Sequence, residues 1–358
     1  MNGKGKLARI IACIAFVIVI AAGIVLLRGG KSGPASAGSE SRKILCTTYP
    51  VFLFVREVAA GGPIRPQLLL PPEAGCPHDY SLTPGDLMKL SGKGTLLIRN
   101  GLGLDDALWK TACAANSDLK SAVLAEGISG VIRNDDDDHE HHGDHHHDHG
   151  RHEKHEKHEK HDSAECADPE CGHHHHHDHD HHHHHHGNGV NGHLFASPDT
   201  AAEMVENAVR ALSAYDPENE ALYKANGQKL KEELLSLAQE FRSAGLDGRR
   251  IAVQHDIFAY LARLCGMKME VSLHAEESQS LSPALIARIC KEIREEKVTV
   301  LYAEPQYSRE TAELIAREAG IAYSVLDPCA SGPSDPESGY YQKVMRKNLE
   351  TLRGGTGK

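Results

Sequence analysis

The sequence lacks the features of several large classes of protein. It carries no basic stripe of the kind that binds nucleic acid, and its formal net charge at pH 7 is -11. It has no His-Glu-x-x-His motif and no Gly-x-Ser-x-Gly nucleophile elbow. The sequence Gly101-Leu102-Gly103 lacks the third glycine of a dinucleotide-binding loop. These absences argue against nucleic-acid binding, metalloprotease chemistry and nucleotide-dependent chemistry.

Histidine and net charge are both scarce outside residues 135–186. That segment holds 23 of the 27 histidines, with 16 acidic and 4 basic residues, so the rest of the chain is close to neutral. Residues 134–192 also have too few apolar side chains to offset the entropy lost on ordering. We therefore expect a disordered, histidine-rich insertion that collects metal ions weakly. The four histidines outside residues 135–186 are His78, His193, His255 and His274.

The N-terminus has the pattern of an export signal. Three basic residues precede an uninterrupted apolar run at 10–27, and Ala35-Ser36-Ala37 offers a small-residue cleavage site. Residues 1–37 are therefore expected to be a signal peptide, with an uncleaved N-terminal anchor as the alternative. The run lacks a Leu-x-x-Cys lipoprotein signal at its end. Both alternatives place the body of the protein in the periplasm or another extracytoplasmic space.

Eight cysteines follow the export segment. An even number in an exported chain permits disulfides, but the sequence does not choose among the pairings. Two of the eight, Cys166 and Cys171, lie in the histidine-rich insertion, where they form either a local disulfide or additional soft metal ligands.

Short apolar runs alternate with amphipathic stretches on both sides of one long helical pattern. This alternation predicts an α/β fold with two lobes, each built on a parallel sheet. We expect an N-terminal lobe at 42–215, a linking helix at 216–247 and a C-terminal lobe at 248–355. The leucines of the linking pattern do not keep the heptad of a coiled coil, which favours a single rigid helix between the lobes.

Four residues that can bind a metal stand at expected loops or strand ends. His255 directly follows a short apolar strand and opens an amphipathic helix, and His78 follows the strand expected at 64–70. Asp327 also stands where a strand ends, and His193 precedes a helix start. Open α/β sheets place their ligand sites beyond the carboxyl ends of strands, so these positions favour a common site.

Three imidazoles with one carboxylate suit Zn²⁺ in near-tetrahedral geometry better than Mg²⁺ or Ca²⁺, which prefer oxygen ligands. If His78, His193, His255 and Asp327 converge, the ion lies in the cleft between the lobes. Four protein ligands leave no open position for a substrate or an activated water. The pattern therefore predicts a protein that binds a metal and is not an enzyme.

Several segments together resemble the substrate-binding proteins of zinc-uptake ABC transporters, the ZnuA-like branch of the cluster A-I family. The resemblance covers about 44–352 and is carried by LLPPEAGCPHDYSLTPGDLMKLSG, RNGLGLDD, HLFASPDTA, DPENEALYKAN, VQHDIFAYLARLCG, LYAEPQYS and SVLDP. It implies two α/β lobes joined by one long helix, with a transition metal bound between them. It also implies delivery of zinc to the membrane permease of an ABC transporter.

The same resemblance implies a role for each candidate ligand. The Pro-His-Asp-Tyr motif gives the first position to His78, and the His-x-aromatic-x-x-Pro motif gives the second to His193. The strand-to-helix histidine is His255, and the Leu-Asp-Pro motif gives the acidic position to Asp327. In some members water or another carboxylate takes this fourth position. Phe195 stands where the second motif often has tryptophan.

Other readings stay open at this point. Manganese-binding relatives tend to have Glu at the third position, so His255 favours zinc, with a manganese- or iron-uptake protein of the same fold as the alternative. A zinc buffer without a transporter is a further alternative. A metal-dependent hydrolase would need a general base, and Glu304 is the one candidate. We expect Glu304 instead to form hydrogen bonds near the site, His274 to be a solvated loop residue, and the protein to be a monomer.

Overall fold

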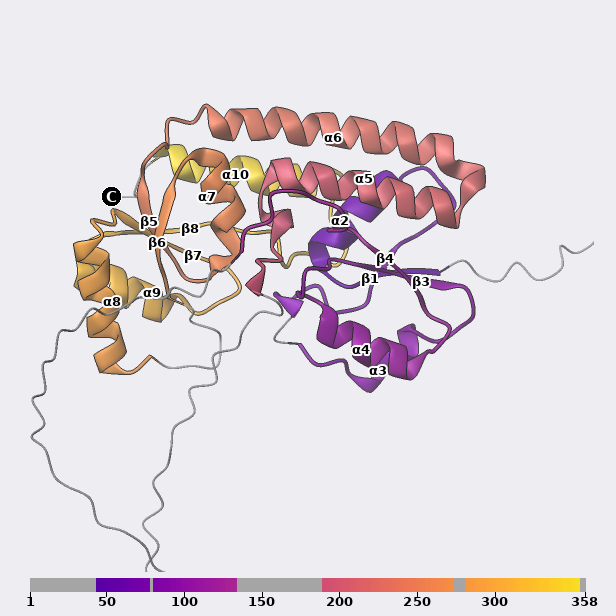
Figure 1. Cartoon of the computed structure of the whole chain (residues 1–358), viewed down its shortest axis with the longest axis horizontal. Helices are drawn as coiled ribbons and strands as arrows, with labels where there is room; N and C mark the ends of the chain where they lie inside the picture. The colour runs from indigo at the N-terminus through magenta and orange to yellow at the C-terminus, as the bar shows by residue number, and fades with distance from the viewer. Residues whose placement is uncertain (1–42, 78–79, 134–188, 274–280, 355–358) are drawn as a thin grey trace, which may run out of the picture. The chain divides into compact units, whose positions relative to one another are not determined.

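The computed structural model describes residues 43–77, 80–133, 189–273 and 281–354. The expected export segment, residues 134–188 of the insertion, His78 and His274 lie outside the described residues. The chain from Ile44 onward forms one compact unit (Figure 1). Within the described ranges, no helix is long and apolar enough to cross a membrane.

The first half of this unit is built on a four-stranded parallel sheet. Its strands, in the order β2-β1-β3-β4, are β1 (Lys43–Cys46), β2 (Gln67–Leu68), β3 (Thr95–Arg99) and β4 (Lys120–Val123). The strand expected at 64–70 is only two residues long. Pro66 and Pro71 flank it and lack the N–H groups that a longer ladder requires.

Helices cover both faces of the first sheet because its strand residues alternate between two cores. The helices are α2 (Tyr49–Val58), α3 (Pro84–Lys89) and α4 (Asp106–Ala115). Ile44 and Ile98 belong to the core that includes the buried side chains of α2. Leu45 and Leu97 belong to a second core with Leu108 of α4. Successive side chains of a strand point to opposite faces, so a strand that is buried on both faces places them alternately in two cores.

The second half repeats the arrangement. Its strands, all parallel in the order β6-β5-β7-β8, are β5 (Arg250–Val253), β6 (Lys268–Ser272), β7 (Val300–Ala303) and β8 (Ala322–Val325). Its helices are α7 (Ala259–Cys265), α8 (Pro283–Glu295), α9 (Arg309–Ala319) and α10 (Tyr340–Gly354). Ala252 and Leu301 pack with Ile293 of α8 and Ile315 of α9. The prediction of two parallel α/β sheets is confirmed.

A pair of long helices separates the two sheets in the sequence. They are α5 (Pro198–Tyr215) and α6 (Glu220–Arg242), joined through the 3₁₀ turn Pro217–Asn219. The linking helix expected at 216–247 therefore begins four residues later and ends five residues earlier, and α6 is about 35 Å long. It packs along α5 (Figure 1), where Gly227 leaves room for Val209. A side chain at Gly227 would place its Cβ 2.1 Å from a methyl group of Val209.

The chain before α10 and the start of α10 pack back onto the first half. Tyr49 at the start of α2 donates a hydrogen bond from its hydroxyl to the carbonyl of Pro333 (2.9 Å). Tyr341 in α10 donates to the carbonyl of Phe195 (2.6 Å) and stacks edge-on against Phe54. These contacts tie the C-terminal half to α2 and to the segment that precedes α5.

The six cysteines in the described part of the chain are all free thiols. None of the disulfides that their even number permits therefore forms among them. Burial raises the pKa of four of these thiols: Cys46, Cys265 and Cys329 lie in the largest hydrophobic core, and Cys290 lies in a core of the second half. Cys166 and Cys171 lie outside the described residues.

A capping box fixes the chain just beyond His78. Thr83 and Asp86 exchange side-chain to backbone hydrogen bonds at the start of α3. The Asp86 carboxylate also accepts hydrogen bonds from the hydroxyl of Tyr80 (2.8 Å) and from Lys89 Nζ (3.0 Å). Burial alone would raise the pKa of Asp86, but the hydrogen bonds from Thr83 and Lys89 outweigh it and lower the pKa to about 2.

We predict that Asp86→Asn lowers the free energy of unfolding at pH 7 by about 2 kcal/mol. The lowered pKa makes the ionised carboxylate stabilising above its ordinary value of 3.8, and this stabilisation is lost as the pH falls through about 2. The difference between variant and parent should therefore shrink between about pH 4 and pH 2. Urea unfolding across this range measures it, with the exposed Asp118→Asn as control. A difference that stays constant with pH would contradict the prediction.

Candidate metal site

The carboxyl edge of the second sheet carries three polar side chains that can bind or surround a metal. His255 follows β5, Glu304 follows β7 and Asp327 follows β8. The N–H of Leu326 donates to the carbonyl of Ala303 (3.0 Å), which continues the ladder between the last two strands to this edge. The strand order β6-β5-β7-β8 makes these three strands neighbours, so their ends lie side by side.

His193 approaches the same region from the segment before α5. Asn100 at the end of β3 donates from Nδ2 to the carbonyl of Gly192 (2.9 Å). Gly192 packs so closely that an added Cβ would lie 3.0 Å from the Cβ of Leu104. His193 then precedes the 3₁₀ turn Leu194–Ala196, and it is only 1% exposed. The loop after β3 therefore fixes where this imidazole stands.

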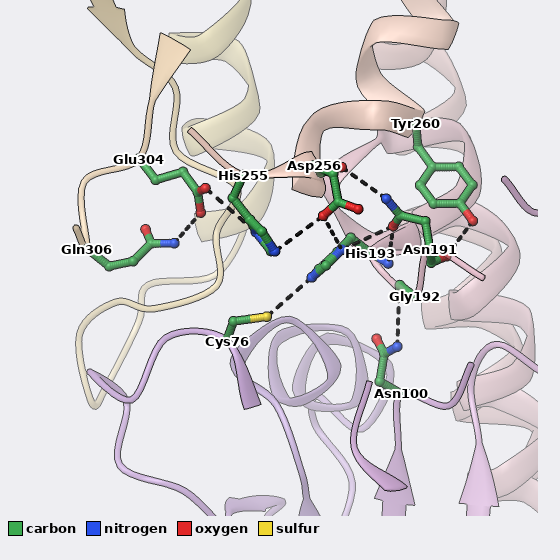
Figure 2. Close-up of polar contacts among 10 residues, drawn as sticks. All are labelled: Cys76, Asn100, Asn191, Gly192, His193, His255, Asp256, Tyr260, Glu304 and Gln306. Carbon is green, nitrogen blue, oxygen red and sulfur yellow. Dashed lines mark hydrogen bonds and ion pairs between the residues drawn. The ribbon is translucent and has the colours of Figure 1, made fainter. Parts of the chain in front are cut away.

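The rings of His193 and His255 meet in the interior. Their centroids are 4.9 Å apart and their planes are close to perpendicular, at 83°. Asp256 stands beside both rings (Figure 2). Its Oδ1 lies 3.2 Å from His255 Nε2 and 3.9 Å from His193 Nδ1. Since His255 is 3% exposed, two buried imidazoles and a buried carboxylate form one cluster.

The side chain of Asn191 fixes the tautomer of His193. Its Oδ1 accepts a hydrogen bond from the backbone N–H of His193 (2.9 Å), and its Nδ2 donates to the carbonyl of Asp256 (3.0 Å). A backbone N–H can only donate and a carbonyl can only accept, so the orientation of the amide is determined. Oδ1, which lies 3.1 Å from His193 Nδ1, must therefore accept from an N–H at that nitrogen. The lone pair of the neutral ring is then on Nε2, the nitrogen that would bind a metal.

The carboxyl groups of Asp256 and Glu304 lie beside His255 and make its surroundings acidic. Glu304 is 0% exposed, and its Oε1 lies 3.8 Å from His255 Nδ1. Gln306 donates a hydrogen bond to the other oxygen of this carboxyl. Burial raises the pKa of Glu304 well above its ordinary value, and the charges of Asp256 and Asp327 raise it further. Burial also raises the pKa of Asp327, against a hydrogen bond from the N–H of Cys329.

Cys76 stands next to His193 on the side away from Asn191. Its Sγ lies 3.2 Å from His193 Nε2 (Figure 2), and the residue is 2% exposed. The sequence indicates Cys76 only as one of eight cysteines that could form disulfides. Its position two residues before His78 was the available signal that it belongs to the site.

The structure brings two of the four predicted ligands together. His193 and His255 meet, Asp327 lies close enough to Glu304 to raise its pKa, and His78 lies outside the described residues. Among the residues that the structure does describe, no three His, Cys, Asp or Glu side chains are arranged to hold a metal ion. The four-residue ligand set therefore stays a prediction. Sequence reasoning missed Asn191 and Asp256, which sit within two residues of a predicted ligand.

Comparison with known sequences assigns the chain to a family. The sequence profile of ZnuA, described as zinc-uptake complex component A, periplasmic, matches residues 44–355. The chain belongs to this family. The residues that match the ZnuA profile contain both sheets, both long helices and every side chain of the site described above.

Two similar proteins are named for zinc uptake or zinc binding. The chain is 25% identical to the high-affinity zinc uptake system protein ZnuA of Bacillus subtilis (strain 168), over 94% of this chain and 95% of that protein. It is 32% identical to the zinc-binding protein AdcA of Streptococcus pyogenes serotype M6 over 167 residues, 45% of this chain and 32% of AdcA. The chain therefore matches only about a third of the length of AdcA.

Solved structures share the fold. A crystal structure of ZnuA matches with a TM-score of 0.62 and 20% sequence identity, over 87% of this chain and 98% of that one. Other solved structures with this fold contain Mn²⁺ or Ni²⁺, at 18% identity. The shared fold therefore does not by itself select the metal.

We predict that Asn191→Ala removes the preference of His193 for the tautomer with hydrogen on Nδ1. The substitution deletes the acceptor that holds this proton, and it should weaken binding of a divalent metal about 10- to 100-fold. Long-range ¹H–¹⁵N NMR correlations of the metal-free protein report the tautomer directly.

Asn191→Asp is the matched comparison, because it keeps an acceptor at Oδ1 and should keep the tautomer. Asn116→Ala, which removes a hydrogen bond to the carbonyl of Leu90 (2.8 Å), controls for general loss of stability. An unchanged His193 tautomer in folded Asn191→Ala would refute the assignment.

Proposed function

We propose that the chain is an extracytoplasmic protein that captures Zn²⁺ at a site formed by His78, His193, His255 and Asp327. It then delivers the ion to the membrane permease of an ABC transporter for uptake. The observation that carries this proposal is the meeting of two buried imidazoles at 4.9 Å, from opposite sides of the long helix pair in the sequence. The description of the family and the names of its zinc-binding relatives support the same reading.

The chemistry of the site favours zinc over manganese or iron. Imidazole suits a borderline-soft ion such as Zn²⁺, whereas Mn²⁺ is better matched by oxygen ligands. His255 supplies nitrogen at the position where a carboxylate would favour manganese. Both nitrogens of His255 face carboxyl groups, Asp256 and Glu304, so whichever nitrogen takes the metal leaves the other facing an acceptor. Such carboxylate–histidine pairs orient metal ligands and increase their basicity.

The surroundings of Glu304 argue against a metal-dependent hydrolase. A hydrolase needs a general base beside an open coordination position that holds water. Glu304 is fully buried, one of its oxygens accepts a hydrogen bond from Gln306, and the other lies 3.8 Å from His255 Nδ1. This carboxyl is therefore placed to orient His255 rather than to activate a water at an open coordination position, which supports a binding role. The description of the family as a component of a zinc-uptake complex supports the same role.

The proposal includes the parts of the chain beyond the described residues. Residues 1–37 would direct export, and the family description places such proteins in the periplasm. The 23 histidines of residues 135–186 would act as a weak, multivalent collector that raises the zinc concentration near the tight site. The protein would act as a monomer that docks on its permease.

We predict that the full chain binds one zinc ion tightly enough to resist a chelator that strips the weak sites. His255→Ala should lower this affinity by about 100-fold or more, because a ligand is lost from a buried site. Chelator competition with metal analysis measures both. His181→Ala, which removes one histidine of the insertion, is the matched control and should leave the tight site unchanged. A tight ion that survives His255→Ala would refute the proposed site.

We also predict that deletion of residues 135–186 leaves the tight zinc site intact. The deleted histidines lie outside the proposed ligand set, so only the number of weakly bound ions should fall. Isothermal titration calorimetry resolves the two classes of site in one experiment. Loss of the tight class on deletion would show that the insertion, and not the buried site, holds the ion.

A further inference from the structure

Cys76 occupies a position in the site that the four-residue ligand set leaves unused. The residue lies in the loop that leads to His78, while His193 lies 117 positions later in the chain. The fold nevertheless places Cys76 Sγ 3.2 Å from His193 Nε2, with both residues buried. In the described part of the chain, no other cysteine is recorded within hydrogen-bond distance of a histidine. Cys76 therefore differs from the cysteines whose side chains only pack in the hydrophobic cores.

The thiol lies on the metal-binding side of the imidazole. Asn191 holds the proton of His193 on Nδ1, so the lone pair that a metal would take is on Nε2. Sγ of Cys76 stands in front of that same nitrogen (Figure 2). An ion bound to Nε2 would therefore have the sulfur within reach.

The separation of the two atoms is close to that of ligands on one zinc ion. Zn–S bonds of about 2.3 Å and Zn–N bonds of about 2.0–2.1 Å at a tetrahedral angle place sulfur and nitrogen about 3.5 Å apart. The observed 3.2 Å is a few tenths of an ångström shorter. A small outward movement of the Cys76 loop would admit the ion. A cysteine that formed a disulfide or only packed in a core would not require an imidazole beside it.

A second, independent feature indicates that a cation belongs beside these residues. Glu304 Oε1 accepts no hydrogen bond from the described residues although the residue is 0% exposed, and it is directed toward His255 (Figure 2). No lysine or arginine of the described chain pairs with this carboxyl. Burial of an acidic group is costly, and a metal ion bound at His255 would offset that cost where no lysine or arginine does.

The geometry points to Cys76 as a sulfur ligand of the transported metal, together with His193 and His255. This inference rests on the proposed function and deepens it. The thiol proton is released to solvent when the metal binds. Because thiolate is a soft ligand, the site should prefer Zn²⁺ and Cd²⁺ strongly and reject Mn²⁺. Cys76 would thus be a determinant of metal specificity, and Asp327 need not complete the coordination.

Cobalt(II) is the direct probe, because a Co²⁺–thiolate bond gives an intense charge-transfer absorption that Co²⁺–imidazole bonds do not. The parent is the full chain with Cys166→Ser and Cys171→Ser, which removes the thiols of the insertion. We expect one Co²⁺ per chain with this absorption, lost in Cys76→Ser and retained in the control Cys113→Ser. Zinc K-edge absorption of the same parent should show one sulfur neighbour, a result that does not depend on how Cys76→Ser folds.

Metal preference gives a second readout. Cys76→Ser should lower the affinity for Cd²⁺ at least about tenfold more than the affinity for Zn²⁺, because Cd²⁺ depends more on the soft ligand. Equal losses for the two ions would contradict a sulfur ligand.

The results of these experiments test the assignment of Cys76 and the proposed zinc capture separately. A tight ion that depends on His255 but has no sulfur neighbour would overturn the assignment of Cys76 and leave the zinc-capture proposal standing. No tight ion that depends on His255 would overturn both.

Discussion

The site depends on hydrogen bonds that a single buried residue, Asn191, makes to several parts of the chain. Its backbone N–H donates to the carbonyl of Ile132 (2.9 Å), and its carbonyl accepts from the hydroxyl of Tyr260 (2.7 Å). Its side chain bonds the backbone of His193 and of Asp256. Each of these groups would cost about 1–3 kcal/mol if left buried and unpaired. The requirement that buried polar groups be paired therefore fixes both imidazoles relative to each other.

Buried acidity is the second constraint on the site. Glu304 and Asp327 follow neighbouring strands, and burial raises the pKa of both. The same carboxyl edge carries His255, and Asp256 lies beside it. An interior with this many acidic groups is unfavourable for an anion and favourable for a cation. The electrostatics of the edge therefore support the metal-binding function that we propose.

The connection between the two sheets has a different physical basis. The chain near Pro333 and helix α10 pack on α2 and on the segment after His193 through aromatic stacking and hydrogen bonds to carbonyl groups. The long helix α6 lies against α5, where Gly227 permits close approach. The second sheet is thereby held to the chain that carries His193. The position of His255 relative to His193 depends on these contacts, none of which involves a metal ligand.

The sequence by itself determined the alternation of strands and helices, because the period of apolar residues is a local property. It also placed His255 and Asp327 at strand ends. It overestimated the strand at 64–70, where flanking prolines limit the ladder, and it began the long helix four residues early, before a 3₁₀ turn. Only the tertiary structure decided that Cys76 stands at His193 Nε2 and that Asn191 fixes the tautomer. Contacts between Cys76 and His193 join positions more than a hundred residues apart, and the packing of the whole chain, not any local pattern, brings such positions together.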